Sequence, residues 1–136
     1  MAGTRELLER FVTLFNENRL EEAEGDYAAD GVAEEIGTNQ RMTPQEGTAS
    51  AREWREAFPD ARGVLSGVVV DGDKGAAEIV WRGTNKGPFM GRPATGLPVT
   101  VRAAVFIETR GGKITRSAHY IDVATMMSQL EQGAGA

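Results

Sequence analysis

The amino-acid sequence predicts an α+β fold in which helices come first and the strands of one curved antiparallel sheet follow. Apolar residues recur at helical spacing as far as Pro59 and at a period of two after it. The turn signals Asp71-Gly72-Asp73 and Gly111-Gly112 separate the alternating runs. Helices followed by a run of strands are typical of the α+β class, and 136 residues suit one domain. We therefore expect a single domain over residues 1–136.

Two helices are predicted at the start of the chain. Thr4 can cap the first helix, which we expect to end at Asn18. Its apolar residues recur three and four positions apart and are Leu7, Leu8, Phe11, Val12, Leu14 and Phe15. Residues 20–27 are predicted as a second, shorter helix with one apolar side, and Asp30-Gly31 is a turn signal.

A short strand over residues 32–36 and a third helix are expected next, with a long loop between them. The loop, residues 37–48, is polar and has no apolar periodicity. The third helix covers residues 50–58 and is closed by Pro59, whose ring does not continue a helix.

Four strands are predicted in the second half of the chain, at residues 62–70, 76–85, 99–108 and 113–120. One face of the third strand is wholly apolar through Val99, Val101, Ala103, Val105 and Ile107. A connection rich in glycine and proline, residues 87–98, precedes it. Asp122 is predicted to cap a closing helix over residues 123–130, and residues 131–136 are expected to form a frayed tail.

The predicted helices must cover one face of the sheet. A strongly bent sheet with N-terminal helices packed over its concave face encloses a pocket, and we expect this cone-shaped arrangement. Because a sheet this apolar needs cover on both sides, a homodimer is expected as well.

Composition narrows the classes of function. The net charge is −5, whereas nucleic-acid binders usually carry a basic face, so we expect no nucleic-acid partner. No run of about 18 apolar residues is present, so no membrane span is expected. The sequence has no cysteine, and therefore neither a disulfide framework nor a thiolate zinc site, and we expect no metal. The charged start MAGTRELLERF does not read as a signal peptide, which makes a cytoplasmic location the default expectation.

The only histidine of the chain, His119, lies at the end of the last predicted strand. Alternation places it on one face with Thr115 and Ser117, and places Ile114, Arg116, Ala118 and Tyr120 on the other. If the first face lines the pocket, His119 can act as acid and base near neutral pH, and Ser117 can orient it or donate to an oxyanion. If that face is the outer one, His119 lies at a dimer interface instead.

Other polar residues are candidates for the same pocket. Glu34 and Glu35 lie where the chain enters the sheet, and one of them should point inward. That residue, Glu35 in our preferred assignment, is a second acid/base candidate, able to pair with His119 and raise the pKa of the imidazole. Otherwise the two form a solvated acidic edge.

Five large side chains are candidates for the wall or lid of the pocket: Trp54, Phe58, Trp81, Phe89 and Met90. Aromatic residues at such spacings are also common in a plain core, so both interpretations stay open. Asn85 can hydrogen-bond a ligand or cap the turn before Gly87.

Three stretches carry a family resemblance: FPDA, WRGTNKGPFMGRPATGLPV, and GGKI with HYID and MMSQL after it. From Phe11 to Leu130 the chain resembles the SnoaL-like polyketide cyclases of the nuclear-transport-factor-2-like superfamily. The resemblance implies a cofactor-independent intramolecular aldol ring closure of an aromatic polyketide ester, a homodimer, and one acid/base carboxylate on the last strand. That carboxylate position falls on His119 here. Relatives often carry a histidine where this chain has Ser117, and another where it has Asn85.

Three functions are compatible with these observations. The first is a cofactor-independent cyclase or isomerase acting on an apolar, polyketide-like substrate. The second is hydrolysis or hydroxylation, as in an epoxide hydrolase of this superfamily, although no Asp-Arg-Asp set is evident in the final strands. The third is a non-catalytic module that binds a small apolar ligand. One fold hosts all three, so the fold alone does not choose among them.

Overall fold

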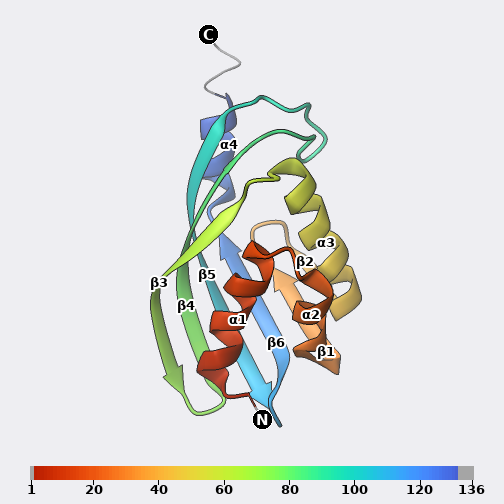
Figure 1. Cartoon of the computed structure of the whole chain (residues 1–136), viewed down its shortest axis with the longest axis vertical. Helices are drawn as coiled ribbons and strands as arrows, with labels where there is room; N and C mark the ends of the chain where they lie inside the picture. Colours follow the sequence, from red (N-terminus) through yellow and green to blue (C-terminus); the bar gives the residue numbers. More distant parts are fainter. Residues whose placement is uncertain (1, 132–136) are drawn as a thin grey trace.

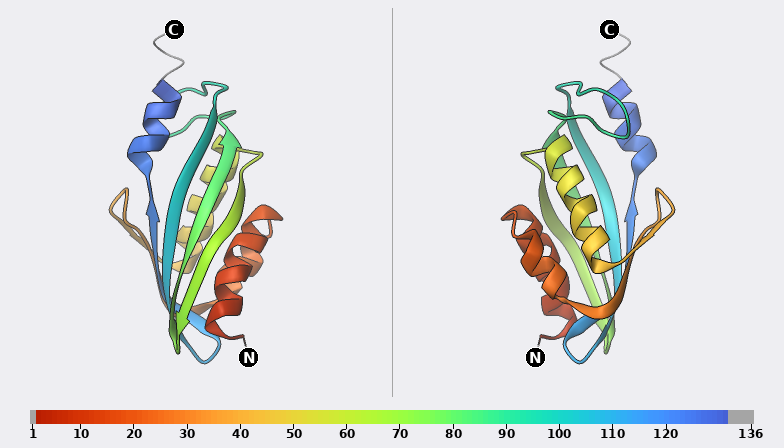
Figure 2. Two further views of the ribbon diagram at one scale, coloured as in Figure 1. Left: turned by 90° about the vertical axis from the view of Figure 1, so that its left-hand side faces the viewer. Right: turned by 90° about the vertical axis from the view of Figure 1, so that its right-hand side faces the viewer.

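The structure is a computed structural model, and it describes residues 2–131 (Figure 1). Its elements, in chain order, are α1 (Thr4–Asn16), α2 (Leu20–Gly25), β1 (Tyr27–Glu35), β2 (Gln40–Met42), α3 (Pro44–Ala57), β3 (Arg62–Asp71), β4 (Lys74–Thr84), β5 (Pro98–Arg110), β6 (Lys113–Ile121) and α4 (Val123–Glu131). The strands form one curved sheet in the order β2-β1-β6-β5-β4-β3. Helices α1, α2 and α3 lie together over one side of it (Figure 2). The predicted α+β fold is confirmed.

The sheet differs from the prediction in one respect, because it is mixed. Strand β1 pairs with β6 in parallel, and the other neighbouring strands are antiparallel. Tight turns impose antiparallel pairing, as at Gly111 and Gly112, whose positive φ values of 60° and 79° suit a two-residue hairpin turn. No turn joins β1 to β6, so local sequence carried no information about their relative direction.

Two apolar clusters hold the layers together. Under α1, the predicted apolar helix face packs on the middle of the sheet through Leu7, Leu8, Val12, Ala77, Ile79, Val105, Ile107 and Ile114. Toward α4, a second cluster joins the end of α3, the loop before β5 and the last helix through Ala57, Phe58, Phe89, Val99, Val101, Met126 and Leu130. The predicted apolar face of β5 contributes to both clusters, which places the main core on the inner side of the sheet.

Several element boundaries differ from the sequence prediction. Helix α3 begins at Pro44, inside the stretch expected to be a loop, because Thr43 and Glu46 form a capping box. Glu46 N donates to Thr43 Oγ1 over 3.1 Å, and Thr43 N donates to Glu46 Oε1 over 2.9 Å. Thr4 does not cap α1: it lies within the helix, and its hydroxyl donates to Gly72 O over 2.9 Å. The second helix ends at Gly25, so that Tyr27 opens β1.

The closing helix matches its prediction at its start. Asp122 caps it, since Thr125 N donates to Asp122 Oδ1 over 3.0 Å. The helix continues to Glu131, the first residue of the expected frayed tail, and the rest of that tail lies outside the described residues.

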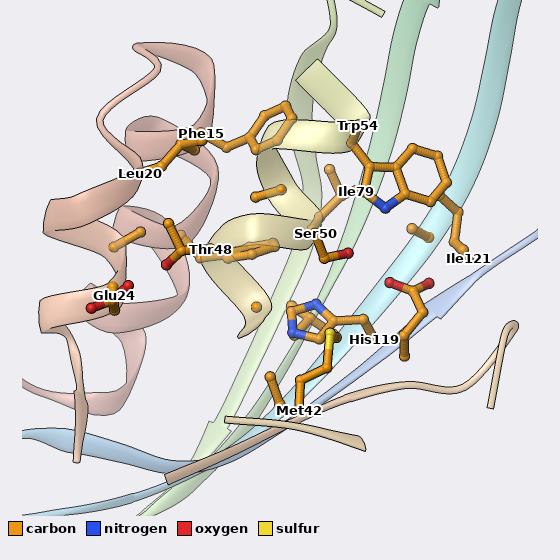
Figure 3. A pocket seen from close by; sticks show the side chains of 18 of the residues that line it. Phe15, Leu20, Glu24, Met42, Thr48, Ser50, Trp54, Ile79, His119 and Ile121 are labelled. Carbon is orange, nitrogen blue, oxygen red and sulfur yellow. The ribbon is translucent and has the colours of Figure 1, made fainter. Parts of the chain in front are cut away.

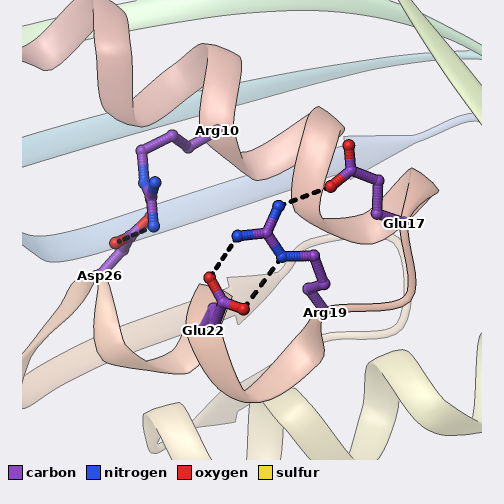
Figure 4. A network of polar contacts seen from close by, with 5 residues as sticks. All are labelled: Arg10, Glu17, Arg19, Glu22 and Asp26. Atoms are coloured by element: carbon purple, nitrogen blue, oxygen red, sulfur yellow. Dashed lines mark hydrogen bonds and ion pairs between the residues drawn. The ribbon is translucent and has the colours of Figure 1, made fainter.

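Ion pairs tie the corner between α1 and β1 (Figure 4). Arg10 Nε donates to Asp26 Oδ2 over 2.8 Å, and Arg19 bonds both Glu22 and Glu17. The Arg10–Asp26 pair fixes α1 next to the residue that precedes Tyr27. Within residues 2–131, none of the helices combines the length and apolar character needed to cross a bilayer.

Candidate functional site

A cavity of about 200 Å³ lies between the inner face of the sheet and the helices α1, α2 and α3 (Figure 3). Its wall is mainly apolar and includes Phe11, Phe15, Leu20, Trp54, Ile79 and Trp81. The polar side chains that reach it come mostly from β1, β6 and the first half of α3. An apolar cavity with few polar groups is the usual form of a small-molecule site.

A bulge in β6 sets which of its residues face the cavity. Pairing with β5 runs from Glu108 with Arg116 to Thr109 with Ile114, so Thr115 has no partner of its own. The predicted inward face is therefore kept at Ser117 and His119. Ile114, expected on the outer face, instead lies in the inner core and lines the cavity. Simple alternation fails there because the bulge inserts one residue.

The imidazole of His119 is held by a chain of hydrogen bonds. Ser117 Oγ lies 2.9 Å from His119 Nε2, and Tyr27 OH lies 2.6 Å from Ser117 Oγ. The Phe11 ring packs against the imidazole with centroids 5.2 Å apart. Protein surrounds the ring, although one part borders the cavity and stays accessible to solvent there. Burial lowers the pKa of His119 to about 4, because the imidazolium would lose its hydration.

Of the two neighbouring glutamates, Glu35 faces the cavity and Glu34 does not. The Cα of Glu35 lies opposite that of His119 in the β1–β6 pair. Glu35 Oε1 is buried without a hydrogen-bond partner, and burial raises the pKa of this carboxyl. On the outer face, Arg116 Nε donates to Glu34 Oε1 over 2.7 Å.

The expected pairing of Glu35 with His119 is wrong. Within residues 2–131 no hydrogen bond or ion pair joins the two side chains, and the pKa of His119 is lowered by burial rather than raised by a carboxylate. Two groups of different character therefore lie on adjacent strands: an imidazole that is neutral at pH 7 and a carboxyl that is hard to ionise.

Three of the five predicted wall residues line the cavity: Trp54, Phe58 and Trp81. Phe89 is buried behind them, with its ring centroid 4.9 Å from that of Trp54 and 5.3 Å from that of Phe58. Met90 is 54% exposed on the loop before β5, where its φ is +50°. These two residues are placed away from the cavity because the loop folds over the end of the second apolar cluster.

Asn85 also lies outside the cavity, and both polar atoms of its amide are hydrogen-bonded within the protein. Its Nδ2 donates to Gly87 O over 2.9 Å, and its Oδ1 accepts from Thr95 N over 2.8 Å. The side chain is 1% exposed. Of the two roles expected for Asn85, the structure supports the turn cap and leaves no free polar atom for a ligand.

Sequence reasoning missed Tyr27, which lines the cavity and bonds Ser117. It had been assigned to the second helix, and nothing in its local pattern distinguishes it. Thr48 and Ser50 also line the cavity. The Thr43-x-x-Glu46 capping pattern would have moved the start of α3 and brought Thr48 onto that helix. Within residues 2–131 there is no group of three or more acidic or histidine side chains suited to a metal ion.

Solved structures with the same fold agree with this architecture. AclR, a proposed hydroxylase from Streptomyces galilaeus, is 20% identical over 94% of this chain and 80% of its own, with a TM-score of 0.84. IdmH, a proposed polyketide cyclase from Streptomyces antibioticus, is 26% identical over 93% of this chain and 96% of its own, with a TM-score of 0.83. A proposed SnoaL-like polyketide cyclase from Jannaschia sp. CCS1 is 19% identical over 92% and 89%, with a TM-score of 0.84.

At the level of sequence, no curated protein matches the chain significantly. The family model described as SnoaL-like polyketide cyclase matches residues 5–130, which includes every helix and strand except the first residue of α1 and the last of α4. The chain therefore belongs to the SnoaL-like polyketide cyclase family.

Proposed function

We propose that this chain is a cofactor-independent enzyme that closes a carbon ring by an intramolecular aldol reaction in a compact, polyketide-like ester. The observation that carries the proposal is the buried, unpartnered Oε1 of Glu35 beside His119 in an apolar cavity. An unpaired buried carboxyl costs free energy. Such groups gather at sites where they act on a ligand, because the same burial tunes their basicity.

The chemistry needs a base, a hydrogen-bond donor and exclusion of water. The base removes a proton from the carbon next to a carbonyl, and the C–H electron pair moves to give an enolate. The enolate carbon attacks a second carbonyl of the same molecule and forms the new C–C bond. The resulting alkoxide then regains the proton. Every atom and electron is accounted for within the substrate and the titratable side chains, with no oxidant or reductant.

The residues around the cavity suit such a substrate. Trp54, Phe58 and Trp81 offer aromatic surface to a flat ring. Glu35 and His119 are the acid/base candidates, and Ser117 positions the imidazole through its contact with Nε2. The volume of about 200 Å³ favours a compact molecule over a large polycycle.

The test is turnover of a panel of aromatic β-keto esters, followed by mass spectrometry and NMR of the products. The wild-type chain should form a cyclised product of unchanged mass or one that differs by loss of water. Glu35→Gln and His119→Ala should each lower kcat/KM about 100-fold or more. The matched control is Glu34→Gln, which removes the neighbouring carboxylate on the outer face and should retain the wild-type rate.

A ligand-binding module of the same fold would give a different result. Esters would then bind and perturb the NMR signal of His119, but no product would form in any variant. That outcome would overturn the enzymatic proposal and favour binding without chemistry.

A further inference from the structure

We infer that the hydrogen-bonded chain from Tyr27 through Ser117 holds His119 as the Nδ1–H tautomer, so that His119 donates a hydrogen bond to the substrate oxygen while Glu35 acts as the base. The inference rests on the proposed function and assigns its two roles. It reverses the expectation from sequence that His119 itself takes the proton.

The geometry of the chain is the starting point. Tyr27 OH and Ser117 Oγ are 2.6 Å apart, and Ser117 Oγ and His119 Nε2 are 2.9 Å apart. Ser117 is 1% exposed. Within residues 2–131, neither hydroxyl has any other hydrogen-bond partner in the protein. Both distances are short enough that each contact must be a hydrogen bond with a defined donor.

Counting hydrogens gives the direction of that chain. If Tyr27 donates to Ser117 and Ser117 donates to Nε2, both hydroxyl hydrogens have an acceptor. If Nε2 carries the hydrogen and donates to Ser117, either the Ser117 or the Tyr27 hydrogen is left without a protein acceptor. The first arrangement leaves only the Nδ1 hydrogen of the imidazole without a protein acceptor, and the imidazole borders the cavity, where water or a ligand can accept it. Ser117 is 1% exposed and burial raises the pKa of the Tyr27 hydroxyl, so an unpaired hydrogen on either hydroxyl is more costly and the first arrangement is favoured. A neutral imidazole has one N–H, which must then be on Nδ1.

Nδ1 faces the cavity. The two nitrogens lie on different sides of the ring, and Nε2 is turned toward Ser117. Among the described residues, Nδ1 has no hydrogen-bond partner. It is also absent from the set of unpartnered polar atoms that the protein buries completely, so it keeps some exposure to solvent. It is therefore reached from the cavity that the imidazole lines. Burial lowers the pKa of His119 to about 4, which keeps the ring neutral at pH 7.

These constraints leave His119 unable to serve as the base at pH 7. Nδ1 already carries a hydrogen, and the lone pair of Nε2 accepts from Ser117. A carboxylate, by contrast, only accepts. Glu35 and His119 lie directly opposite each other on adjacent strands, which are roughly 4.8 Å apart, so both can reach one carbonyl unit.

The aldol step then takes a definite form. The Glu35 carboxylate removes the proton from the carbon next to the carbonyl, and the C–H pair moves to the enolate. The Nδ1–H of His119 donates to the enolate oxygen throughout. After the C–C bond forms, the protonated Glu35 returns the proton to the new alkoxide.

The first experiment reads the tautomer directly by ¹⁵N NMR of the untagged chain, whose lone histidine gives an unambiguous signal. At pH 7 we expect a neutral ring with the hydrogen on Nδ1. The same result is expected in Tyr27→Phe, because Ser117 still donates to Nε2. Ser117→Ala should lose the single tautomer, whereas Ser66→Ala, at an exposed serine of β3, should not. An Nε2–H tautomer or an imidazolium in the wild type at pH 7 would overturn the inference.

The second experiment separates donor from base by kinetics on the same ester panel. The amide nitrogen of asparagine is attached to Cγ, as Nδ1 is in histidine, so His119→Asn keeps a donor but has no base. We expect His119→Asn to stay within about tenfold of the wild-type kcat, and His119→Ala to lose about 100-fold. Equal losses in both variants would contradict the donor role of His119.

The two proposals fail in different ways. Absence of turnover by the wild-type chain would overturn the proposed function, whatever the tautomer. Turnover together with an Nε2–H ring, or with an inactive His119→Asn, would leave the function standing and overturn the assignment of roles. If Ser117→Ala does not fold, the wild-type spectrum and the His119→Asn rate still decide the question.

Discussion

Protonation of His119 should destabilise the folded chain by about 3 kcal/mol. Burial lowers the pKa of the imidazole from 6.5 to about 4 in the fold. A pKa difference of about 2.5 corresponds to about 3 kcal/mol, at about 1.4 kcal/mol for each pH unit. Water in the cavity would hydrate the imidazolium in part and reduce this value, so about 3 kcal/mol is the upper end.

The sign follows from linkage. The folded state binds the proton more weakly than the unfolded chain, so the contribution of His119 to stability is complete above pH 6.5. It is lost as the pH falls from 6.5 toward 4 and changes little below that.

The assay is urea unfolding followed by the fluorescence of Trp54 and Trp81, at pH 7, 6, 5 and 4. Carboxylates also titrate in this range: folding lowers the pKa of Asp60 and Asp122 and raises that of Glu35. The effect of His119 is therefore the difference in the free energy of unfolding between the wild type and His119→Asn at each pH. That difference should change by about 3 kcal/mol between pH 7 and pH 4. A difference independent of pH would refute the buried, neutral imidazole on which the site is built.

Two further predictions concern stability. Glu35→Gln should raise the free energy of unfolding at pH 7 by about 1 kcal/mol, because a neutral amide avoids the cost of burying an ionised carboxyl, the cost that raises the pKa of Glu35. The gain should vanish in urea titrations below the ordinary pKa of glutamate, and a loss at pH 7 would contradict the assigned burial. Asn85→Ala should lower the free energy of unfolding by about 2 kcal/mol, because it leaves Thr95 N–H and Gly87 C=O unpaired. A rise in KM with an unchanged free energy of unfolding would instead indicate that Asn85 contacts the ligand.

Local patterns were enough to predict most of the fold. Four of the five apolar residues in the period-two run at Val99–Ile107 are buried in β5, and Ala103 is half-buried. Gly111-Gly112 and Asp122 act as turn and cap. These features depend on neighbours a few residues away, which is the range over which sequence periodicity operates. The start of α3 at Pro44 was missed, although its capping box was present, because the apolar spacing begins later.

Long-range pairing decided the rest of the site. Alternation alone could not choose between Glu34 and Glu35, and the β1–β6 register decides it by placing the Cα of Glu35 opposite that of His119. Tyr27 and Ser117 are hydrogen-bonded although ninety positions separate them in the sequence, and no local sequence pattern predicts this contact. The homodimer and the cytoplasmic location stay predictions.

The sequence by itself determined the class of fold, the family and the importance of the single histidine, because spacing, turns and a few family stretches encode these locally. Only the tertiary structure decided what that histidine can do. The parallel β1–β6 pair brings Glu35 beside it, and the bulge at Thr115 keeps Ser117 and His119 turned inward. Phe11 of α1 packs against the imidazole and shields part of it from water. The pKa and the tautomer of an imidazole depend on burial and on hydrogen-bond partners. The burial is supplied by residues remote in sequence such as Phe11, and the partner Ser117 is itself bonded by Tyr27, ninety positions away.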